Sequence, residues 1–391
     1  MGFLGFYLAA ALLSVQQDQA PLRTGCEDSD ELLTRVPAGT PVVIRFAING
    51  CYAVRVGELS GFLPAAALAG LETWEAERRQ ARALDTPVGA APVNLTPGAS
   101  PVTEASQLLT GNRPAEAVTL LERALAQSPR DAGLLGMAGL AAWRANRTGQ
   151  AISYWKDAQA IRPDPGVAAL LAKAEREAFA DQGTPTLEST RFSLRYEQKV
   201  MSTEVARSLS AVLELEFTRI SDDLGCQTAE RLSATAQSRQ AYLQATGAAE
   251  WSGGQFDGRI RVAVVEDAGV GAETRKRFAH ELVHACLAGT GSWPAWLHEG
   301  LAQRLSGDTL SQEARAEVRA AAQSGALPPL KQMNQNWSRL SADHARLAYA
   351  SALYAVELFY LHYKEFGIRT LVRNPEFLDR IAADIDQRMR T

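Results

Sequence analysis

The sequence has no excess of basic residues. Its 391 residues include 40 Lys and Arg against 44 Asp and Glu, which leaves a formal net charge of −4 at pH 7. Binding to nucleic-acid phosphates needs a basic patch, and no dense stripe of Lys and Arg is present. We therefore expect no nucleic acid among the partners of this protein.

Long hydrophobic runs are scarce as well. One apolar run, residues 3–15, is too short to cross a bilayer comfortably, and no later segment has the length and apolarity of a membrane span. The run lies where a secretory signal has its apolar region, so we expect residues 1–20 to be a cleaved signal peptide, although the usual Lys or Arg before the run is missing. A buried N-terminal helix is the alternative. A lipid anchor on Cys26 is disfavoured because Arg23 stands where an acylation site has an aliphatic residue.

Cysteine is also rare, with four residues in the whole chain. An even number in an exported protein favours disulfides, and pairing within each half of the chain would join Cys26 to Cys51 and Cys226 to Cys286. We therefore expect a secreted or periplasmic protein.

The first folded segment, residues 24–80, alternates short β-branched runs with turn residues. Residues 41–47 and 51–57 predict two strands joined by an Asn-Gly hairpin. The segment resembles bacterial SH3-like domains, which implies a small β-barrel with or without a peptide or cell-wall ligand. The resemblance rests on the order Gly50, Tyr52, Val54, Gly57, Gly61, Phe62, Leu63, Leu68.

A linker and a repeat follow. Residues 85–102 are rich in Pro, Gly, Ala and Thr without apolar periodicity, which indicates a linker. At an offset of 34 residues, the segment 111–131 matches 145–165, and residues 103–182 resemble tetratricopeptide repeats. The resemblance implies paired helices that act either as a spacer packed on the next domain or as a groove for a protein partner.

From residue 186 to 391 the pattern predicts a small sheet followed by a helical half, so the fold class is α+β multidomain. Residues 258–266 are a clear strand. We expect it to be an edge strand that can pair with an extended substrate.

Three of the five histidines lie close together, within residues 280–298. The sequence His280-Glu281-Leu282-Val283-His284 has the H-E-x-x-H spacing, and residues four apart on a helix share one face, so both imidazoles can bind one ion. Glu281 projects beside them. A helix with two hydrogen-bonded histidines and a surface glutamate is the alternative.

A second cluster, residues 294–303, predicts a third ligand. Its helix has an apolar side, so Glu299 would be largely buried, where a carboxylate is costly unless it is paired or binds a metal. Two His and one Glu around Zn²⁺ leave a fourth position for water, as in catalytic zinc sites. His298 is the rival third ligand.

The two clusters together resemble the gluzincin zinc metallopeptidases of the peptidase MA-like group, in which H-E-x-x-H is followed by Trp-Leu-x-Glu-Gly-Leu-Ala. The second motif here is Trp296-Leu297-His298-Glu299-Gly300-Leu301-Ala302. The resemblance extends weakly over residues 186–391. It implies that His280, His284 and Glu299 hold one zinc ion per chain.

The resemblance also implies hydrolysis of a peptide or protein substrate. Zinc would activate water, and Glu281 would take the proton and pass it to the leaving amine. Tyr349, with Tyr354 behind it, is the candidate donor to the oxyanion, although a core tyrosine is the alternative for either.

One departure from the family pattern concerns Gln303. Related peptidases often have an acidic residue at this position, which orients a histidine. The competing functions are a scaffold protein whose peptidase-like domain holds metal without cleaving anything, and a zinc hydrolase of a non-peptide amide. A retained Glu281 favours the peptidase.

Overall fold

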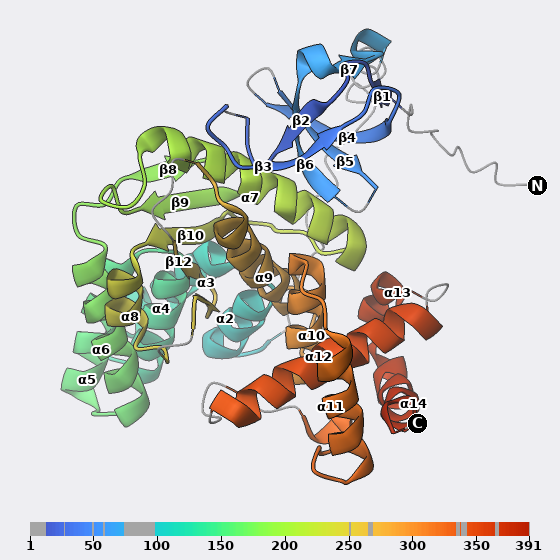
Figure 1. The fold of residues 1–391 in the computed structure, drawn as a ribbon. Helices are drawn as coiled ribbons and strands as arrows, with labels where there is room; N and C mark the ends of the chain where they lie inside the picture. Colours follow the sequence, from blue (N-terminus) through green and yellow to red (C-terminus); the bar gives the residue numbers. More distant parts are fainter. Residues whose placement is uncertain are drawn as a thin grey trace, which may run out of the picture.

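The protein folds as a multipart α+β chain. Within the described residues of this computed structural model, an N-terminal antiparallel sheet is followed by a set of helices, then by a small mixed sheet and C-terminal helices (Figure 1). No helix among those residues is long and apolar enough to cross a bilayer. The structure describes residues 13–26, 28–48, 51–57, 59–73, 98–249, 252–264, 269–333, 337, 342–363 and 367–390.

The N-terminal sheet has seven strands in the order β3-β2-β6-β5-β4-β1-β7, and all of its pairings are antiparallel. The predicted hairpin is confirmed, because β4 pairs with β5. The strands are β1 (Leu13–Val15), β2 (Ala20–Arg23), β3 (Leu32–Val36), β4 (Pro41–Ile48), β5 (Cys51–Val56), β6 (Leu59–Pro64) and β7 (Leu68–Ala69).

This sheet is open, so the prediction of a small SH3-like β-barrel is wrong in that respect. A closed barrel needs hydrogen bonds between its first and last strands. Among the described residues, β7 pairs only with β1 and β3 pairs only with β2. At the far edge of the sheet, Leu32 of β3 is 40% exposed.

The sheet also includes part of the predicted signal peptide. Leu13 and Val15 in β1 are buried, and β1 pairs with both β4 and β7. The sheet thus begins inside residues 1–20, of which residues 1–12 lie outside the described part. Cleavage of a signal peptide stays a prediction.

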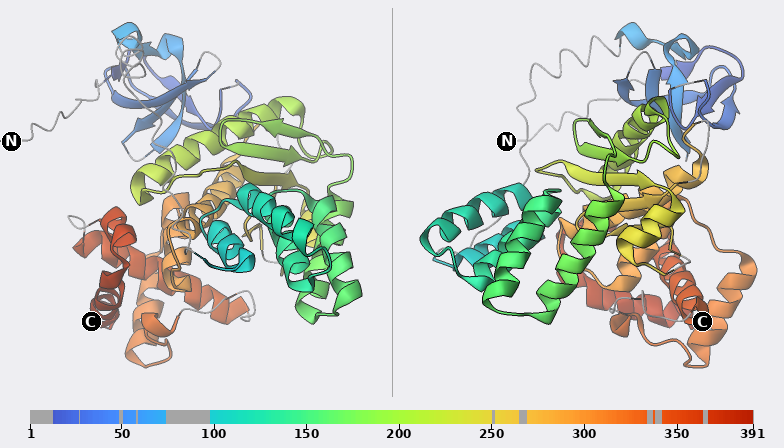
Figure 2. Two further views of the ribbon diagram at one scale, coloured as in Figure 1. Left: turned by 180° about the vertical axis from the view of Figure 1, so that it is seen from behind. Right: turned by 90° about the vertical axis from the view of Figure 1, so that its left-hand side faces the viewer.

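Five helices follow between residues 101 and 180. Residues 85–97 of the predicted linker lie outside the described part of the chain. Each helix packs against the next in the chain, and together they form the helical repeats (Figure 2). They are α2 (Pro101–Thr110), α3 (Pro114–Gln127), α4 (Ala132–Arg144), α5 (Thr148–Ile161) and α6 (Pro165–Ala180).

The repeat of 34 residues seen in the sequence is present in the backbone. Asn112 and Asn146 precede α3 and α5 in the same left-handed conformation, with φ of 54° and 61°. Each is followed by an arginine whose N–H bonds to a carbonyl five residues back, Arg113 to Leu108 at 2.9 Å and Arg147 to Ala142 at 2.8 Å. This Schellman geometry ends one helix and sets the entry angle of the next.

The second sheet has the strand order β11-β12-β10-β9-β8. The three central strands are parallel, and β8 and β11 are antiparallel edges. The strands are β8 (Thr186–Glu188), β9 (Phe192–Tyr196), β10 (Leu232–Gln237), β11 (Gly254–Phe256) and β12 (Ile260–Ala263).

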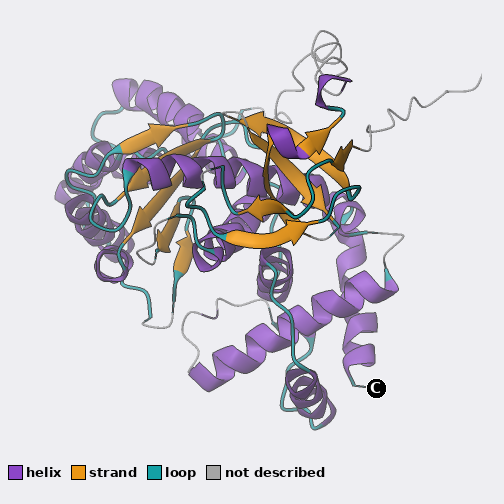
Figure 3. Ribbon diagram, turned by 45° about the horizontal axis from the view of Figure 1, so that its top comes forward, coloured by secondary structure: helices purple, strands orange, loops and turns teal. Residues whose placement is uncertain are grey.

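Eight helices within the described residues of 203–389 belong to this part, and Figure 3 shows the two groups of strands above the C-terminal helices. Gly225, in the left-handed conformation with φ of 76°, ends the helix Thr203–Leu224. The helices are α7 (Thr203–Leu224), α8 (Arg239–Thr246), α9 (Ala272–Ala288), α10 (Ala295–Ser306), α11 (Gln312–Gln323), α12 (Ala342–His362), α13 (Ile368–Arg373) and α14 (Leu378–Met389), with 3-10 turns at Ala65–Ala67, Leu330–Gln332 and Pro375–Phe377.

The two faces of the second sheet differ in polarity, because side chains alternate along a strand. Ile260 and Val262 of β12 belong to the large apolar core that includes α7 and α9. Their neighbours Arg259 and Arg261 are also buried, and they form ion pairs with Glu177 of α6 and with Asp181 directly after it. One face of the sheet therefore supports the helix that carries the H-E-x-x-H motif, and the other supports the helical repeats.

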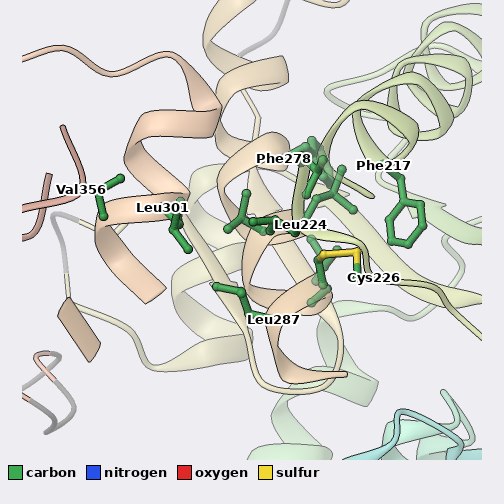
Figure 4. Close-up of a cluster of buried hydrophobic side chains, with 14 of the residues drawn as sticks. Phe217, Leu224, Cys226, Phe278, Leu287, Leu301 and Val356 are labelled. Atoms are coloured by element: carbon green, nitrogen blue, oxygen red, sulfur yellow. A yellow bond between two sulfur atoms is a disulfide. The ribbon is translucent and has the colours of Figure 1, made fainter. Parts of the chain in front are cut away.

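The core beneath that helix joins α7, α9, α10 and α12. Figure 4 shows Phe217, Leu224, Phe278 and Leu287 around the disulfide at Cys226, with Leu301 farther away at the side of Val356. Buried carbon surface contributes about 25 cal/mol per Å² of apolar area removed from water, so this cluster is a main source of stability.

Candidate metal centre

The H-E-x-x-H segment lies in the middle of α9, where regular helix geometry places His280 and His284 one turn apart on the same face. The opposite face carries Phe278, Leu282 and Cys286, each at most 3% exposed. The helix therefore has an apolar back that faces the core. Because this apolar face docks into the core, the two imidazoles are held on the side of α9 that faces α10.

Glu299 reaches the histidines from α10. Trp296, Leu297 and Leu301 of this helix are at most 1% exposed, so the helix is fixed in the core. A Cβ added at Gly300 would lie 2.3 Å from the carbonyl oxygen of Ala352, so α10 and α12 approach closely beside Glu299. A glycine is required at this crossing.

The three side chains form a group that could hold a metal ion. Their ligand atoms lie within 4.8 Å of one another. Glu299 Oε2 is 3.4 Å from His280 Nε2 and 3.6 Å from His284 Nε2. Ligand atoms around tetrahedral zinc, with bonds of about 2.0–2.2 Å, lie about 3.3–3.6 Å apart, which matches these two distances.

A second observation supports a metal here. Glu299 Oε2 is buried and accepts no hydrogen bond of normal geometry within the described residues. A buried carboxylate oxygen without a hydrogen-bond donor is costly unless a cation compensates it. The donor set of two imidazoles and one carboxylate suits zinc.

The charges of the group are strongly coupled. Burial alone would raise the pKa of Glu299, but His284 and His280 outweigh it and hold that pKa well below its usual range. Burial alone would lower the pKa of His284, but Glu299 outweighs it and raises the pKa. The pocket thus favours an ionised carboxylate facing a positive charge, which a metal ion would supply instead of a proton.

Glu281 lies on the same helix as the two histidines. Its side chain is 6% exposed, and burial raises its pKa despite the opposing effect of His280 and His284. On the other side it meets the backbone of β11, where a Cβ added at Gly254 would lie 2.5 Å from Glu281 Oε1. A carboxylate beside the three candidate metal ligands, held in place by the backbone of β11, is suited to accept and return a proton.

A cleft of about 880 Å³ opens over the group. Residues of β11, α9 and α10 line it, together with Trp293, Trp337 and Tyr349. The edge strand beside the cleft is β11, and β12 lies between β11 and β10. The prediction that residues 258–266 form the edge is therefore wrong. The three-residue strand β11, from a Gly-rich segment, pairs with β12 on its outer side and becomes the edge strand.

Tyr349, on α12, lines this cleft, and burial, with Glu299 and Glu281 nearby, raises its pKa. Its ring packs edge-on against Trp337 at 5.3 Å between centroids. Tyr354 instead belongs to the buried core at 8% exposure. The structure thus brings Tyr349 and not Tyr354 to the candidate site.

His298 and Gln303 lie next to the group. His298 Nδ1 is 3.4 Å from His284 Nδ1, and burial lowers the pKa of His298 to about 4. Gln303 Nε2 donates to the carbonyl oxygens of Glu299 at 3.1 Å and Tyr349 at 2.9 Å. Gln303 therefore links α10 to α12 at the place where an acidic residue was expected to orient a histidine.

Two residues at the site were missed in the sequence, Gly254 and Tyr242. The hydroxyl of Tyr242 on α8 donates to the carbonyl oxygen of Gly254 at 2.8 Å and supports β11 from below. The nearest signal was the run Ser252-Gly253-Gly254, since glycine inside a strand marks close approach of the backbone.

The two predicted disulfides are confirmed. Cys226 after α7 pairs with Cys286 on α9, which ties the motif helix to its neighbour, and Cys26 pairs with Cys51 in the N-terminal sheet. They indicate an oxidising environment, extracellular or periplasmic.

Comparison with protein-family models, curated proteins and solved structures finds no match to this chain.

Proposed function

We propose that the protein is an exported zinc-dependent metallopeptidase of gluzincin type, in which Glu281 acts as general base in the hydrolysis of peptide bonds. The observation that carries the proposal is the convergence of His280, His284 and Glu299 beside a buried Glu281, at the floor of an open cleft. A structural metal site needs no carboxylate base beside its ligands, whereas a hydrolytic site does.

The metal chemistry follows from the donor set. When bound by His280, His284 and Glu299, zinc would supply a Lewis acid that polarises the substrate carbonyl and acidifies water. Glu281 would accept a proton from the attacking water and donate it to the amine that leaves. Its enclosure by α9 and the backbone of Gly254 keeps the carboxylate in one place for both transfers.

Substrate would lie in the cleft between β11 and α12. An extended peptide could add to β11 as a further strand, because edge strands offer unpaired backbone groups. Tyr349, on the α12 side, would donate its hydroxyl to the developing oxyanion. Trp293 and Trp337 would supply apolar surface for a side chain of the substrate.

The first test is metal content, measured by elemental mass spectrometry on protein purified without chelator. We expect about one zinc ion per chain in the wild type and its loss in Glu299→Ala, as a three-ligand site implies. His298→Ala is the matched control, which removes a neighbouring imidazole and should keep the zinc. Retention in Glu299→Ala with loss in His298→Ala would move the third ligand to His298.

The second test is turnover on a library of fluorogenic peptides. Glu281→Gln should keep zinc but lower kcat by roughly two to four orders of magnitude, the usual contribution of general acid–base catalysis. A zinc-loaded wild type that cleaves no peptide would favour the scaffold protein. Cleavage of non-peptide amides alone would favour the third candidate, a hydrolase of another substrate class.

A further inference from the structure

We propose that the helical repeats α2–α6 position the β11–β12 hairpin at the cleft, and that Lys173 is a positioning residue for the edge strand. The link to catalysis rests on the proposed function, in which the backbone of β11 lies beside the general base Glu281. The contacts between the repeats and the hairpin do not depend on that function.

The turn of the hairpin lies among the repeat helices. Asp257 forms an ion pair with Lys173 of α6, and the two side chains are 19% and 18% exposed. The next residue, Gly258, has φ of 103°, and a Cβ there would lie 2.9 Å from Nε of Arg144 on α4. The turn thus fits against α4 and α6 without room for a side chain at its tip.

The residue after the turn is anchored more deeply. Arg259 is 2% exposed and pairs with Glu177 of α6, which is fully buried. The guanidinium also lies 4.0 Å from the ring centroid of Trp143, whose Nε1 donates to Glu177 Oε2 at 2.7 Å. Ions this deeply buried are tolerated only when paired, so the arrangement requires the hairpin and the repeats to stay docked.

The interface between the second sheet and the helical repeats extends beyond the hairpin. Arg261 of β12 donates to both oxygens of Asp181, at 2.8 and 2.6 Å. At the other end, the Glu230 carboxylate accepts from the backbone N–H groups of Ala115 at 2.8 Å and Glu116 at 3.2 Å, at the start of α3. This face of the repeats is occupied by the chain's own second sheet, which favours a positioning role over capture of a separate protein partner through residues 103–182.

The position of β11 depends on this docking. The strand has three residues, its one strand neighbour within the described part of the chain is β12, and its other side borders the cleft. A short edge strand has little stability of its own. What holds it are the anchored turn at one end and the hydroxyl of Tyr242 on Gly254 at the other.

The test compares Lys173→Ala with Lys173→Arg, which keeps the charge, and with Lys156→Ala. Lys156 is the matched control because it forms an exposed ion pair with Glu175 in the same repeats, away from the hairpin. Amide hydrogen exchange is followed in the full-length zinc-loaded protein, in the peptic peptide that covers residues 252–264, with zinc content measured alongside.

Lys173→Ala should accelerate exchange at β11 and the turn by about tenfold, because local opening becomes easier once the turn is released. Zinc content should stay unchanged, and Lys173→Arg and Lys156→Ala should exchange like the wild type. For cleaved peptides, KM should rise in Lys173→Ala more than kcat falls. Exchange in Lys173→Ala no faster than in Lys156→Ala would overturn the proposal. If the wild type cleaves no peptide, the exchange result still decides it, and that failure counts against the peptidase alone.

Discussion

Gly254 and Glu281 lie in direct contact, although one is on the edge strand β11 and the other on α9. A methyl group at position 254 would come within 2.5 Å of Oε1 and 3.1 Å of the carboxyl carbon of Glu281. The backbone of β11 is therefore the wall that sets the position of the candidate general base.

Gly254→Ala should displace the Glu281 carboxylate and lower kcat by about tenfold or more, because small misplacements of a reacting group are costly. The atoms nearest the added methyl group belong to Glu281 and to none of the three proposed zinc ligands, so metal content should stay at the wild-type level. Gly289→Ala is the control, since the nearest atom to an added Cβ there is 3.6 Å away. Equal kcat in both variants would contradict the assigned role of the contact.

Gly300→Ala should destabilise the protein and weaken zinc binding. An added Cβ would press against the carbonyl oxygen of Ala352 at 2.3 Å and force α10 away from α12, carrying Glu299 with it. Overpacking of this kind costs about 1–3 kcal/mol of unfolding free energy. Chemical denaturation and a zinc titration would measure the two effects.

A matched control for that variant is Gly136→Ala in α4. Its nearest neighbour would be 3.7 Å away, and alanine favours a helix over glycine by up to about 1 kcal/mol. Gly136→Ala should therefore be neutral or stabilising. A Gly300→Ala protein as stable as Gly136→Ala would show that α10 and α12 do not need this close crossing.

Acid should destabilise the packing of α7 on α9 through Glu216. Burial alone would raise the pKa of this side chain, but Arg275 and Arg219 outweigh it and hold the pKa below 4.5. A carboxyl group with a lowered folded-state pKa contributes stability above its unfolded-state pKa, and that contribution is lost as pH falls through the folded-state value. Urea unfolding between pH 7 and pH 3 should show this loss.

Glu216→Gln separates this group from other carboxylates. The variant should be less stable than wild type at pH 7, because Arg275 and Arg219 lose their partner, which is 2% exposed. Its stability should also fall less on acidification. A parallel decline in both proteins would mean that other groups carry the acid sensitivity.

Glu31→Ala should destabilise the contact between the N-terminal sheet and α9. α9 has no side-chain cap of its own, and the Glu31 carboxylate accepts from the N–H of Ala272 in its first turn. Loss of a cap costs about 1 kcal/mol of unfolding free energy. Asp28→Ala, at an exposed position nearby, should leave thermal and urea unfolding unchanged.

Local patterns in the sequence predicted much of the candidate site. Residues four apart on a helix must share a face, so the pairing of His280 with His284 follows from their spacing alone. Glu299 was predicted because an acidic residue in an apolar helix needs a cation, and the resemblance to the gluzincin pattern favoured it over His298. Both disulfides were also predicted correctly from the positions of the four cysteines. The 34-residue repeat of the sequence recurs in the backbone at Asn112 and Asn146.

Other features depended on contacts between distant segments. The sequence of residues 258–266 indicated a strand, but the neighbours of a strand depend on which other segments pair with it. Here one of those neighbours is the short β11. Closure of the N-terminal sheet likewise depended on its two edges meeting, which they do not.

The helix with its two candidate metal ligands, the α+β class and the cysteine pairs follow from the amino-acid sequence. Apolar periodicity acts within a single helix or strand, and the positions of the cysteines favour one pairing. The wall at Gly254, the identity of the edge strand, and the burial of Arg259 against Glu177 and Trp143 arise only in the folded chain. Gly254 and Arg259 contact residues on other elements, far away in the chain, and only the packing of complete elements around a common core brings such residues together.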